Sequence, residues 1–218
     1  MTVLRLRPPS AMTPHSLIVC LHGVGADAAS LHPFGEMIQS ANPTSAVVIP
    51  DAPHRFDLGG PGCQWFSVHG VTNANRAERI AATLPWLDAF IQAECRRWSL
   101  TSHDVGVCGF SQGAMMALAL AGRNHPLRAI ASIAGRVAAP VIMKSDSSPE
   151  IFLSHGESDP VVPFACLSEA YRAFELGGWA VTQLPVSGLG HTIAPTQAEA
   201  IGKFLARCFA AKSLEPAA

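Results

Sequence analysis

The chain has 218 residues, of which 49% are hydrophobic and only 14% are charged. This composition supports a sizeable core and excludes an intrinsically disordered chain, which combines low hydrophobicity with high net charge. The 15 basic and 16 acidic side chains leave a formal net charge of -1 without a basic block, so we expect no nucleic-acid partner.

Membrane insertion and secretion are both disfavoured by the apolar runs. The longest unbroken run, residues 114–121, is far shorter than the roughly 20 residues that cross a bilayer. An early run at residues 17–21 ends in His22 and Gly23 without a small-residue cleavage site, so we expect a cytoplasmic protein. The six cysteines show neither a CxxC pair nor zinc-ligand spacing, which predicts buried reduced thiols and no metal site.

Runs of strand length alternate along the chain with segments of helical period, the pattern of βα units on a mostly parallel sheet. Most of the runs are rich in Val and Ile and are bounded by Gly, Pro or Asp, as buried parallel strands are. The predicted strands are residues 3–6, 16–21, 46–49, 104–108, 128–133, 151–154 and 179–184.

The clearest helix begins near Asn75, where Glu78 completes the spacing of a capping box. Its apolar positions keep helical spacing as far as Trp98. Pro85 lies inside this segment and is expected to kink or split the helix, because proline lacks the N–H of an internal helical residue.

Three further helices are predicted over residues 114–120, from Pro163 to the glycines at 177 and 178, and from about 195 to 209. In the last of these, Thr196 and Glu199 repeat the capping-box spacing, and residues 213–218 after it are expected to fray. The predicted fold is one three-layer α/β/α sandwich over residues 1–218, with about seven strands.

The segment Gly109-Phe110-Ser111-Gln112-Gly113 directly follows a predicted strand and directly precedes a predicted helix. A turn this sharp holds the serine in strained backbone geometry with its hydroxyl above the sheet, and its flanking positions need glycine. The strand and helix context favours Ser111 as a nucleophile over a serine in a plain turn.

A serine nucleophile needs a base and an orienting acid, which in this fold follow it in the order acid, then histidine. Asp159 comes after the predicted strand 151–154 and His191 after the next one, 179–184, so we expect both at the same edge of the sheet as Ser111. Glu157 is a less favoured alternative for the acid. His22 and His155 also end strands, and each is followed by glycine, so we expect them to tie loops down.

The segment from Leu21 to Asp27 closes an early strand, where an oxyanion hole draws its first backbone donor. The second donor comes from the residue after the nucleophile. This assigns the hole to the amides of Val24 and Gln112, and it explains Gly23 and Gly25 as residues that permit the tight turn.

Two other classes of protein remain in view. Gly23, Gly25 and Ala28 fit a dinucleotide-binding pattern, and Asp51 stands where a ribose-binding acid is expected, so a nicotinamide or flavin oxidoreductase is an alternative. That reading leaves the serine, acid and histidine series unexplained, and Pro33 delays the helix it requires. A catalytically inactive binding module is disfavoured because no triad position is substituted.

The sequence resembles the carboxylesterase and acyl-protein thioesterase family of α/β-hydrolases over nearly its whole length. The residues that carry the resemblance are Leu21-His22-Gly23-Val24-Gly25, Pro50-Asp51-Ala52-Pro53, Gln64-Trp65-Phe66, Gly109-Phe110-Ser111-Gln112-Gly113, His155-Gly156, Asp159-Pro160-Val161-Val162-Pro163 and Gly190-His191. The resemblance implies ester or thioester hydrolysis without a cofactor, by the triad Ser111, Asp159 and His191.

Two residues bear on substrate binding. The resemblance implies that Trp65 lies beside the acyl pocket, and the alternative is an aromatic side chain that pins a long loop. Ile133-Ala134-Gly135-Arg136 departs from the Ser-Gly and apolar loop usual in the thioesterases, and it places a guanidinium near the active edge. Arg136 either pairs with a local carboxylate or meets an anionic leaving group.

The sequence thus predicts a serine hydrolase, a monomer or a homodimer, that acts on short to medium acyl esters of small molecules. An acyl-protein or lysophospholipid thioesterase of the same mechanism is the nearest alternative. The 16 residues 135–150 are too few for a helical cap, so we expect no lid and an open groove between the Trp65 loop and the helix at Pro163.

Overall fold

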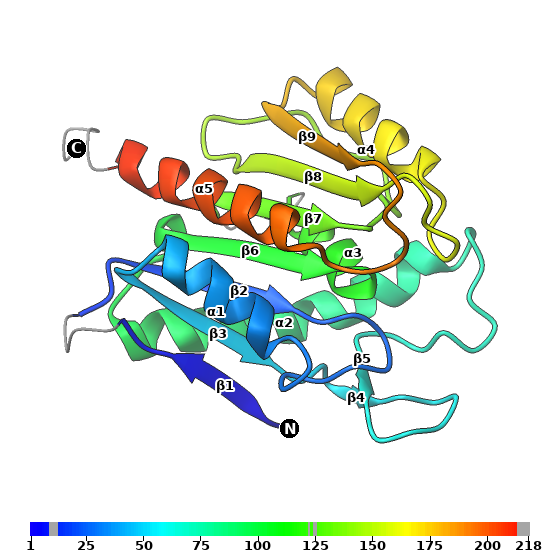
Figure 1. The fold of residues 1–218 in the computed structure, drawn as a ribbon, viewed down its shortest axis with the longest axis horizontal. Helices are drawn as coiled ribbons and strands as arrows, with labels where there is room; N and C mark the ends of the chain where they lie inside the picture. Colours follow the sequence, from blue (N-terminus) through cyan, green and yellow to red (C-terminus); the bar gives the residue numbers. More distant parts are fainter. Residues whose placement is uncertain (9–12, 122, 124–125, 213–218) are drawn as a thin grey trace.

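A computed structural model describes residues 1–8, 13–121, 123 and 126–212. Seven strands form one sheet in the order β1-β3-β2-β6-β7-β8-β9, and every neighbouring pair is parallel except β1 with β3 (Figure 1). The strands are β1 (Val3–Leu6), β2 (Ser16–Leu21), β3 (Ser45–Pro50), β6 (Val105–Phe110), β7 (Ala129–Ile133), β8 (Glu150–Gly156) and β9 (Val181–Val186). All seven predicted strands are present, with ends that shift by at most two residues.

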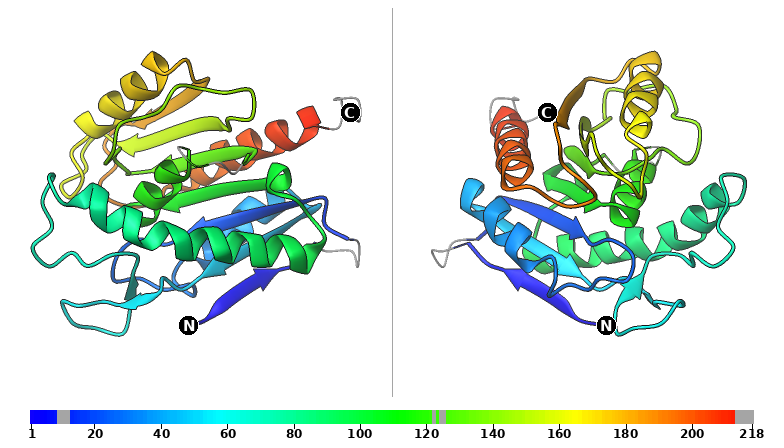
Figure 2. Two further views of the ribbon diagram at one scale, coloured as in Figure 1. Left: turned by 180° about the vertical axis from the view of Figure 1, so that it is seen from behind. Right: turned by 45° about the vertical axis from the view of Figure 1, so that its right-hand side comes forward.

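Helices cover both faces of the sheet. They are α1 (His32–Ala41), α2 (Arg76–Trp98), α3 (Gln112–Leu120), α4 (Ala165–Leu176) and α5 (Pro195–Lys212). α1 and α5 lie in front of the sheet in Figure 1, while α2 and α3 come forward in the view from behind in Figure 2. The buried residues of α4 pack into the same cluster as those of α2 and α3. The predicted three-layer α/β/α fold is therefore confirmed.

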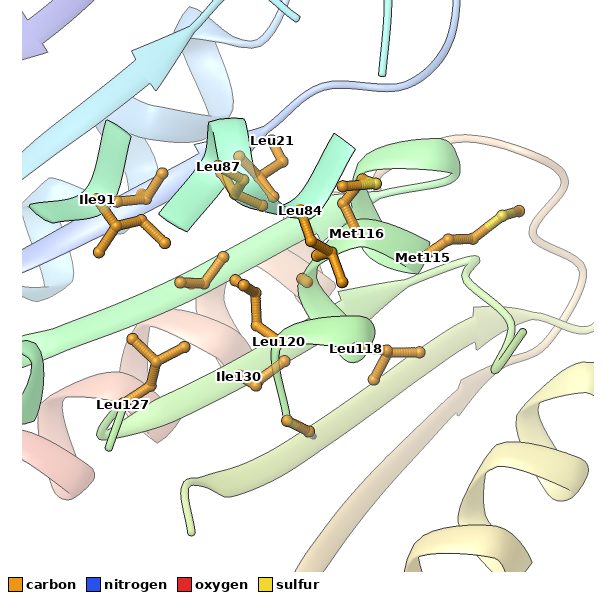
Figure 3. Packing of buried hydrophobic residues seen from close by; sticks show 14 of the residues in the cluster. Leu21, Leu84, Leu87, Ile91, Met115, Met116, Leu118, Leu120, Leu127 and Ile130 are labelled. Atoms are coloured by element: carbon orange, nitrogen blue, oxygen red, sulfur yellow. The ribbon is translucent and has the colours of Figure 1, made fainter. Parts of the chain in front are cut away.

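Each face of the sheet has its own hydrophobic cluster, as a parallel sheet covered on both sides requires. On the α2 side, Leu84, Leu87 and Ile91 pack toward Met116 and Leu120 of α3 (Figure 3). The three α2 residues recur at positions i, i+3 and i+7, so one stripe of the helix is buried. This packing fixes the helix that begins directly after Ser111.

The predicted helix caps are wrong in detail. Asn75 makes no side-chain bond to the first turn of α2; instead its side-chain oxygen accepts a hydrogen bond from the amide of Thr72. α2 continues through Pro85 without a split. At the start of α5, Gln197 reaches back to the amide of Ala194, whereas Glu199 pairs with a lysine one turn later.

Some elements lie outside the predictions. The helix expected at Pro163 begins at Ala165. α1 and a small pair of strands, β4 (His54–Arg55) and β5 (Cys63–Gln64), were not predicted. α1 contains Gly35, where a Cβ would stand 2.6 Å from the Ile49 side chain of β3, so the helix approaches the sheet closely. The expected fraying of residues 213–218 falls outside the described residues.

Candidate active site

Four parallel strands, β6, β7, β8 and β9, lie side by side and end at one edge of the sheet. Ser111 follows β6, Asp159 follows β8 and His191 follows β9. Ligands of open α/β sheets bind in the crevice outside the carboxyl ends of the strands. The three residues predicted as a triad therefore meet where this fold places a site.

Ser111 occupies a strained turn between β6 and α3. Its backbone angles are φ 53° and ψ -114°, outside the regions that a residue with a side chain prefers. A Cβ on Gly109 would collide with the backbone of Gly113, and a Cβ on Gly113 would collide with the carbonyl of Leu21. The two glycines therefore allow the tight crossing that lifts the serine above the sheet.

His191 joins the serine to the aspartate. With its proton on Nδ1, it donates to Asp159 Oδ2 at 2.7 Å, while Nε2 accepts from Ser111 Oγ at 2.9 Å. The three side chains form one continuous chain of hydrogen bonds. This geometry is the one in which a histidine acts as a general base toward a serine hydroxyl.

Asp159 is held ionised by its surroundings. Burial opposes the charge, but hydrogen bonds from His191 and from the amides of Val162 and Val161 outweigh it and lower the pKa of this carboxyl. Glu157 is exposed, and no hydrogen bond to His191 is present among the described residues. The geometry thus favours Asp159 over Glu157 as the acid of the triad.

His22 organises the loop that carries Val24. Its Nδ1 donates to the carbonyl of Gly23 at 2.7 Å and its Nε2 accepts from the amide of Ala52 at 2.9 Å. Burial lowers the pKa of His22, so the ring stays neutral and keeps this tautomer. His155 donates in the same manner to the carbonyl of Val162 at 2.9 Å. Both histidines therefore tie loops down, as predicted.

The expected oxyanion donors are unoccupied. Within the described part of the chain, the N–H groups of Val24 and Gln112 donate to no acceptor. The loop around Val24 is held by backbone bonds from Gly25 to the carbonyl of Cys63, and from Cys63 to the carbonyl of Ala26, both 2.8 Å. Two open amides beside a nucleophile match the requirements of an oxyanion hole.

Trp65 is not positioned to touch a substrate. Its side chain is 0% exposed, and its Nε1 donates to the carbonyl of His22 at 2.8 Å. The Gln112 side chain accepts from the Trp65 amide and donates to the carbonyl of Phe66, each at 2.8 Å. The expectation of a Trp65 beside the acyl pocket is therefore corrected, because the indole pins the loop from inside.

A cavity of about 400 Å³ touches the triad. Its lining includes His191, Gly23, Phe110, Ile193 and Met37. This cavity lies on the side of α1 and α5, whereas the expected groove ran between the Trp65 loop and the start of α4. The lining of this cavity contains neither Trp65 nor a residue of α4.

Arg136 lies on the other side of the triad, after β7. Its Nη1 stands 3.5 Å from the side-chain oxygen of Asn73, and its Nε is buried without a partner. Among the described residues it forms no ion pair with a carboxylate. The first of the two roles considered for Arg136, pairing with a local acid, is therefore not observed.

Asp51, the residue that the oxidoreductase alternative needs to bind a ribose, forms hydrogen bonds within the chain instead. The Asp51 carboxylate accepts hydrogen bonds from the amides of Ala28, at 2.9 Å, and Thr2, at 2.5 Å, so both oxygens serve the chain itself. No cluster of three side chains able to hold a metal ion is found among residues that the structure describes. In the same residues, no helix is both long and apolar enough to span a bilayer.

The chain matches the phospholipase/carboxylesterase family over residues 9–209. It belongs to this family. Esterase YpfH of Escherichia coli is 30% identical over 184 residues, which cover 81% of this chain and 76% of that protein. Acyl-protein thioesterase 1 of Kluyveromyces lactis is 24% identical over 180 residues, 76% of this chain and 78% of that protein.

Among solved structures, the crystal structure of esterase PE8 superposes with a TM-score of 0.85 at 30% identity, covering 94% of this chain and 97% of that one. Both activities in the family's name cleave carboxylic esters, and the chain is accordingly an ester hydrolase of this family. The predicted family and activity are confirmed, and the oxidoreductase alternative is set aside.

Proposed function

We propose that the protein is a serine carboxylesterase that works through an acyl-enzyme, with Ser111 as nucleophile, His191 as base and Asp159 as orienting acid. The observation that carries the proposal is the unbroken hydrogen-bond chain from Ser111 Oγ through His191 to Asp159. A serine hydroxyl is a weak nucleophile at neutral pH, so a base at 2.9 Å is the feature that activates it.

His191 takes up and returns a proton once in each half of the reaction. Nε2 takes the proton of Ser111 as Oγ attacks the ester carbonyl, and the amides of Val24 and Gln112 donate to the resulting oxyanion. The tetrahedral intermediate collapses when His191 returns that proton to the departing alcohol. Water then attacks the acyl-serine by the same route, which releases the acid and restores the hydroxyl.

The substrates we propose are short to medium acyl esters, for which the cavity beside His191 offers apolar cover from Phe110, Ile193 and Met37. Each fully covered methylene contributes about 0.8 kcal/mol to binding. Thioesters react by the same steps, and the similarity to an acyl-protein thioesterase makes them the second candidate. The six unpaired cysteines support a reducing compartment, and we propose the cytoplasm.

A fluorophosphonate probe tests the nucleophile. We expect one covalent adduct on Ser111, located by mass spectrometry of peptides, and loss of both adduct and ester turnover in Ser111→Ala. The exposed Ser168 of α4 provides a matched control, and Ser168→Ala is expected to label and to turn over like the wild type. An adduct that persists in Ser111→Ala would refute the assignment.

A further inference from the structure

Two arginines meet at the edge of the sheet that carries the triad. Arg136 follows β7, which lies between the strands that lead to Ser111 and Asp159. Arg76 is the first residue of α2. The side-chain oxygen of Asn73 stands 2.6 Å from Nη1 of Arg76 and 3.5 Å from Nη1 of Arg136. The two cations are therefore neighbours.

Among the residues that the structure describes, neither Arg76 nor Arg136 forms an ion pair with an acidic side chain. The Nε of Arg136 is buried and donates to nothing. A buried donor on a charged group is costly to leave unpaired, and such groups in native proteins call for an explanation. A ligand oxygen would supply the missing acceptor.

The surroundings of Arg76 disfavour its charged form. Burial, followed by the positive charge of Arg136, lowers the pKa of Arg76 below its usual value. The N-terminus of α2 adds the positive end of a helix dipole. Three sources of positive potential thus converge on one place, which stabilises a bound anion.

Several charges influence the thiol of Cys166 in α4. Burial raises the pKa of this thiol, the charges of Arg136 and Arg76 lower it, and those of Glu169 and Asp159 raise it. Glu169 is exposed on α4 and forms no ion pair with either arginine among the described residues.

An apolar cavity of about 210 Å³ lies between α2, α3 and the segment after β7. Its lining includes Ala77 and Val137, the residues next to the two arginines, and Met115, one turn of α3 after Ser111. Apolar side chains therefore lie next to both arginines and to the helix that begins after Ser111.

We propose that Arg76 and Arg136 together bind a carboxylate on one limb of the ester substrate, so that the protein is selective for carboxylate-bearing esters. A planar guanidinium matches the two oxygens of a carboxylate, and two guanidinium groups share its charge. The other limb then occupies the cavity beside His191. This inference rests on the proposed function, because it assigns the substrate of the same serine.

Two matched substrate pairs test it, one for each limb. Mono-4-nitrophenyl adipate and 4-nitrophenyl hexanoate share a six-carbon acyl chain that ends in a carboxylate or a methyl group. 4-Acetoxybenzoate and 4-acetoxybenzamide share an acetyl group and differ in the charge of the leaving group. The measured quantity is the ratio of kcat/KM, charged over neutral, so intrinsic reactivity cancels between variants.

We expect Arg136→Gln and Arg76→Gln each to lower this ratio by about tenfold or more for one of the two pairs. The pair that responds shows whether the bound carboxylate belongs to the acyl chain or to the leaving group. Arg172→Gln, which removes an exposed arginine of α4, is expected to keep the wild-type ratio. A merely structural role lowers kcat/KM for both members of a pair alike.

A ratio that stays unchanged in both arginine variants for both pairs would overturn the anion site while leaving the esterase intact. Failure of the wild type to hydrolyse any of the four esters, or turnover of the esters by Ser111→Ala, would overturn the proposed function itself and this inference with it. Turnover by the wild type and its loss in Ser111→Ala thus separate the two failures.

Discussion

Asp159 divides its two carboxylate oxygens between His191 and its own loop. Oδ2 accepts from His191, while Oδ1 accepts from the amides of Val161 and Val162 at 2.8 and 2.9 Å. The loop bonds hold the carboxylate in place before any substrate arrives. A side chain of the same shape can keep those loop bonds and still lose the correct tautomer of the histidine.

Asp159→Asn is therefore expected to lower kcat by about 10⁴-fold with little loss of stability, because the amide presents a donor to the ring. Esterase kinetics together with urea unfolding measure both effects. Glu157→Gln is the matched control and is expected to be mild, since Glu157 is exposed. The opposite ranking of the two variants would move the acid to Glu157.

Trp65→Phe tests the loop that carries Val24. The variant keeps an aromatic ring but leaves the carbonyl of His22 without a donor inside the core, which is expected to cost about 1–3 kcal/mol of unfolding free energy. We expect kcat to fall as well, because the same loop aims the Val24 amide. Trp86→Phe, at a half-buried position, is the control, and equal losses in both variants would contradict this role.

The meeting of Ser111, Asp159 and His191 could be predicted from the sequence because the three residues follow strands that run parallel, and such strand ends meet at one edge. The position of Trp65 could not. Trp65 is held by a bond from its amide to the Gln112 side chain and by a bond from the Thr83 hydroxyl to its carbonyl, and both partners lie on helices later in the chain. The family resemblance indicates that the loop with Trp65 lies near the active site, but only the packed structure shows that the indole faces the core.

Among the elements, buried strands were the easiest to predict, since β2, β3 and β7 are buried along their whole length and read as continuous apolar runs. α1 was missed because Gly35 weakens its local helical signal, even though Pro33 stands in the first turn, where proline is favoured. It forms where Gly35 fits closely against Ile49 of β3, a contact that no local pattern reveals. Tertiary packing overrides propensity there.

Pro85 is the clearest element-level test. It lies inside α2 and removes one internal hydrogen bond, which costs about 3 kcal/mol in an ordinary helix. Pro85→Ala is therefore expected to raise the unfolding free energy by roughly 2 kcal/mol, after subtraction of the entropy that proline removes from the unfolded chain. Urea unfolding measures the change.

Pro163→Ala provides the contrast, because Pro163 precedes α4 and interrupts no helix. That variant is expected to lose roughly 0.5 kcal/mol of unfolding free energy, since the substitution only raises the conformational entropy of the unfolded chain. A Pro85→Ala variant no more stable than the wild type would contradict this expectation, because it would mean that the packing of α2 offsets the cost of the missing hydrogen bond.

At the scale of the whole molecule, Asp51 makes stability depend on pH. Burial opposes its charge, but the amides of Ala28 and Thr2 outweigh burial and lower its pKa. A depressed carboxyl pKa stabilises the fold above the unfolded value of about 4, and this contribution disappears as the pH falls through the folded value. Asp51 thereby joins β1, β3 and the loop after β2.

Asp51→Asn is expected to be less stable than the wild type at pH 7, with a difference that shrinks steadily below pH of about 4. Unfolding in urea at pH values from 7 to 3 measures it. A difference that stays constant over this range would mean that the loss comes from geometry and not from the charge.

The connection between β7 and β8 also acts at this scale. Residues 134–149 contain no helix, so nothing there forms a lid of the kind that buries its own apolar face. We expect no jump in rate as a tributyrin-like substrate passes its solubility limit. A clear jump there would indicate a mobile cover.

One thiol makes the loop around Val24 open to direct observation. Five cysteines are buried, and only Cys63 is half-buried. Its backbone is bonded to Gly25 and Ala26 of that loop. Burial raises the pKa of Cys63, so alkylation is slow at neutral pH and proceeds in mild alkali. An environment-sensitive dye attached to Cys63 would therefore report movements of the loop during turnover, without an engineered cysteine.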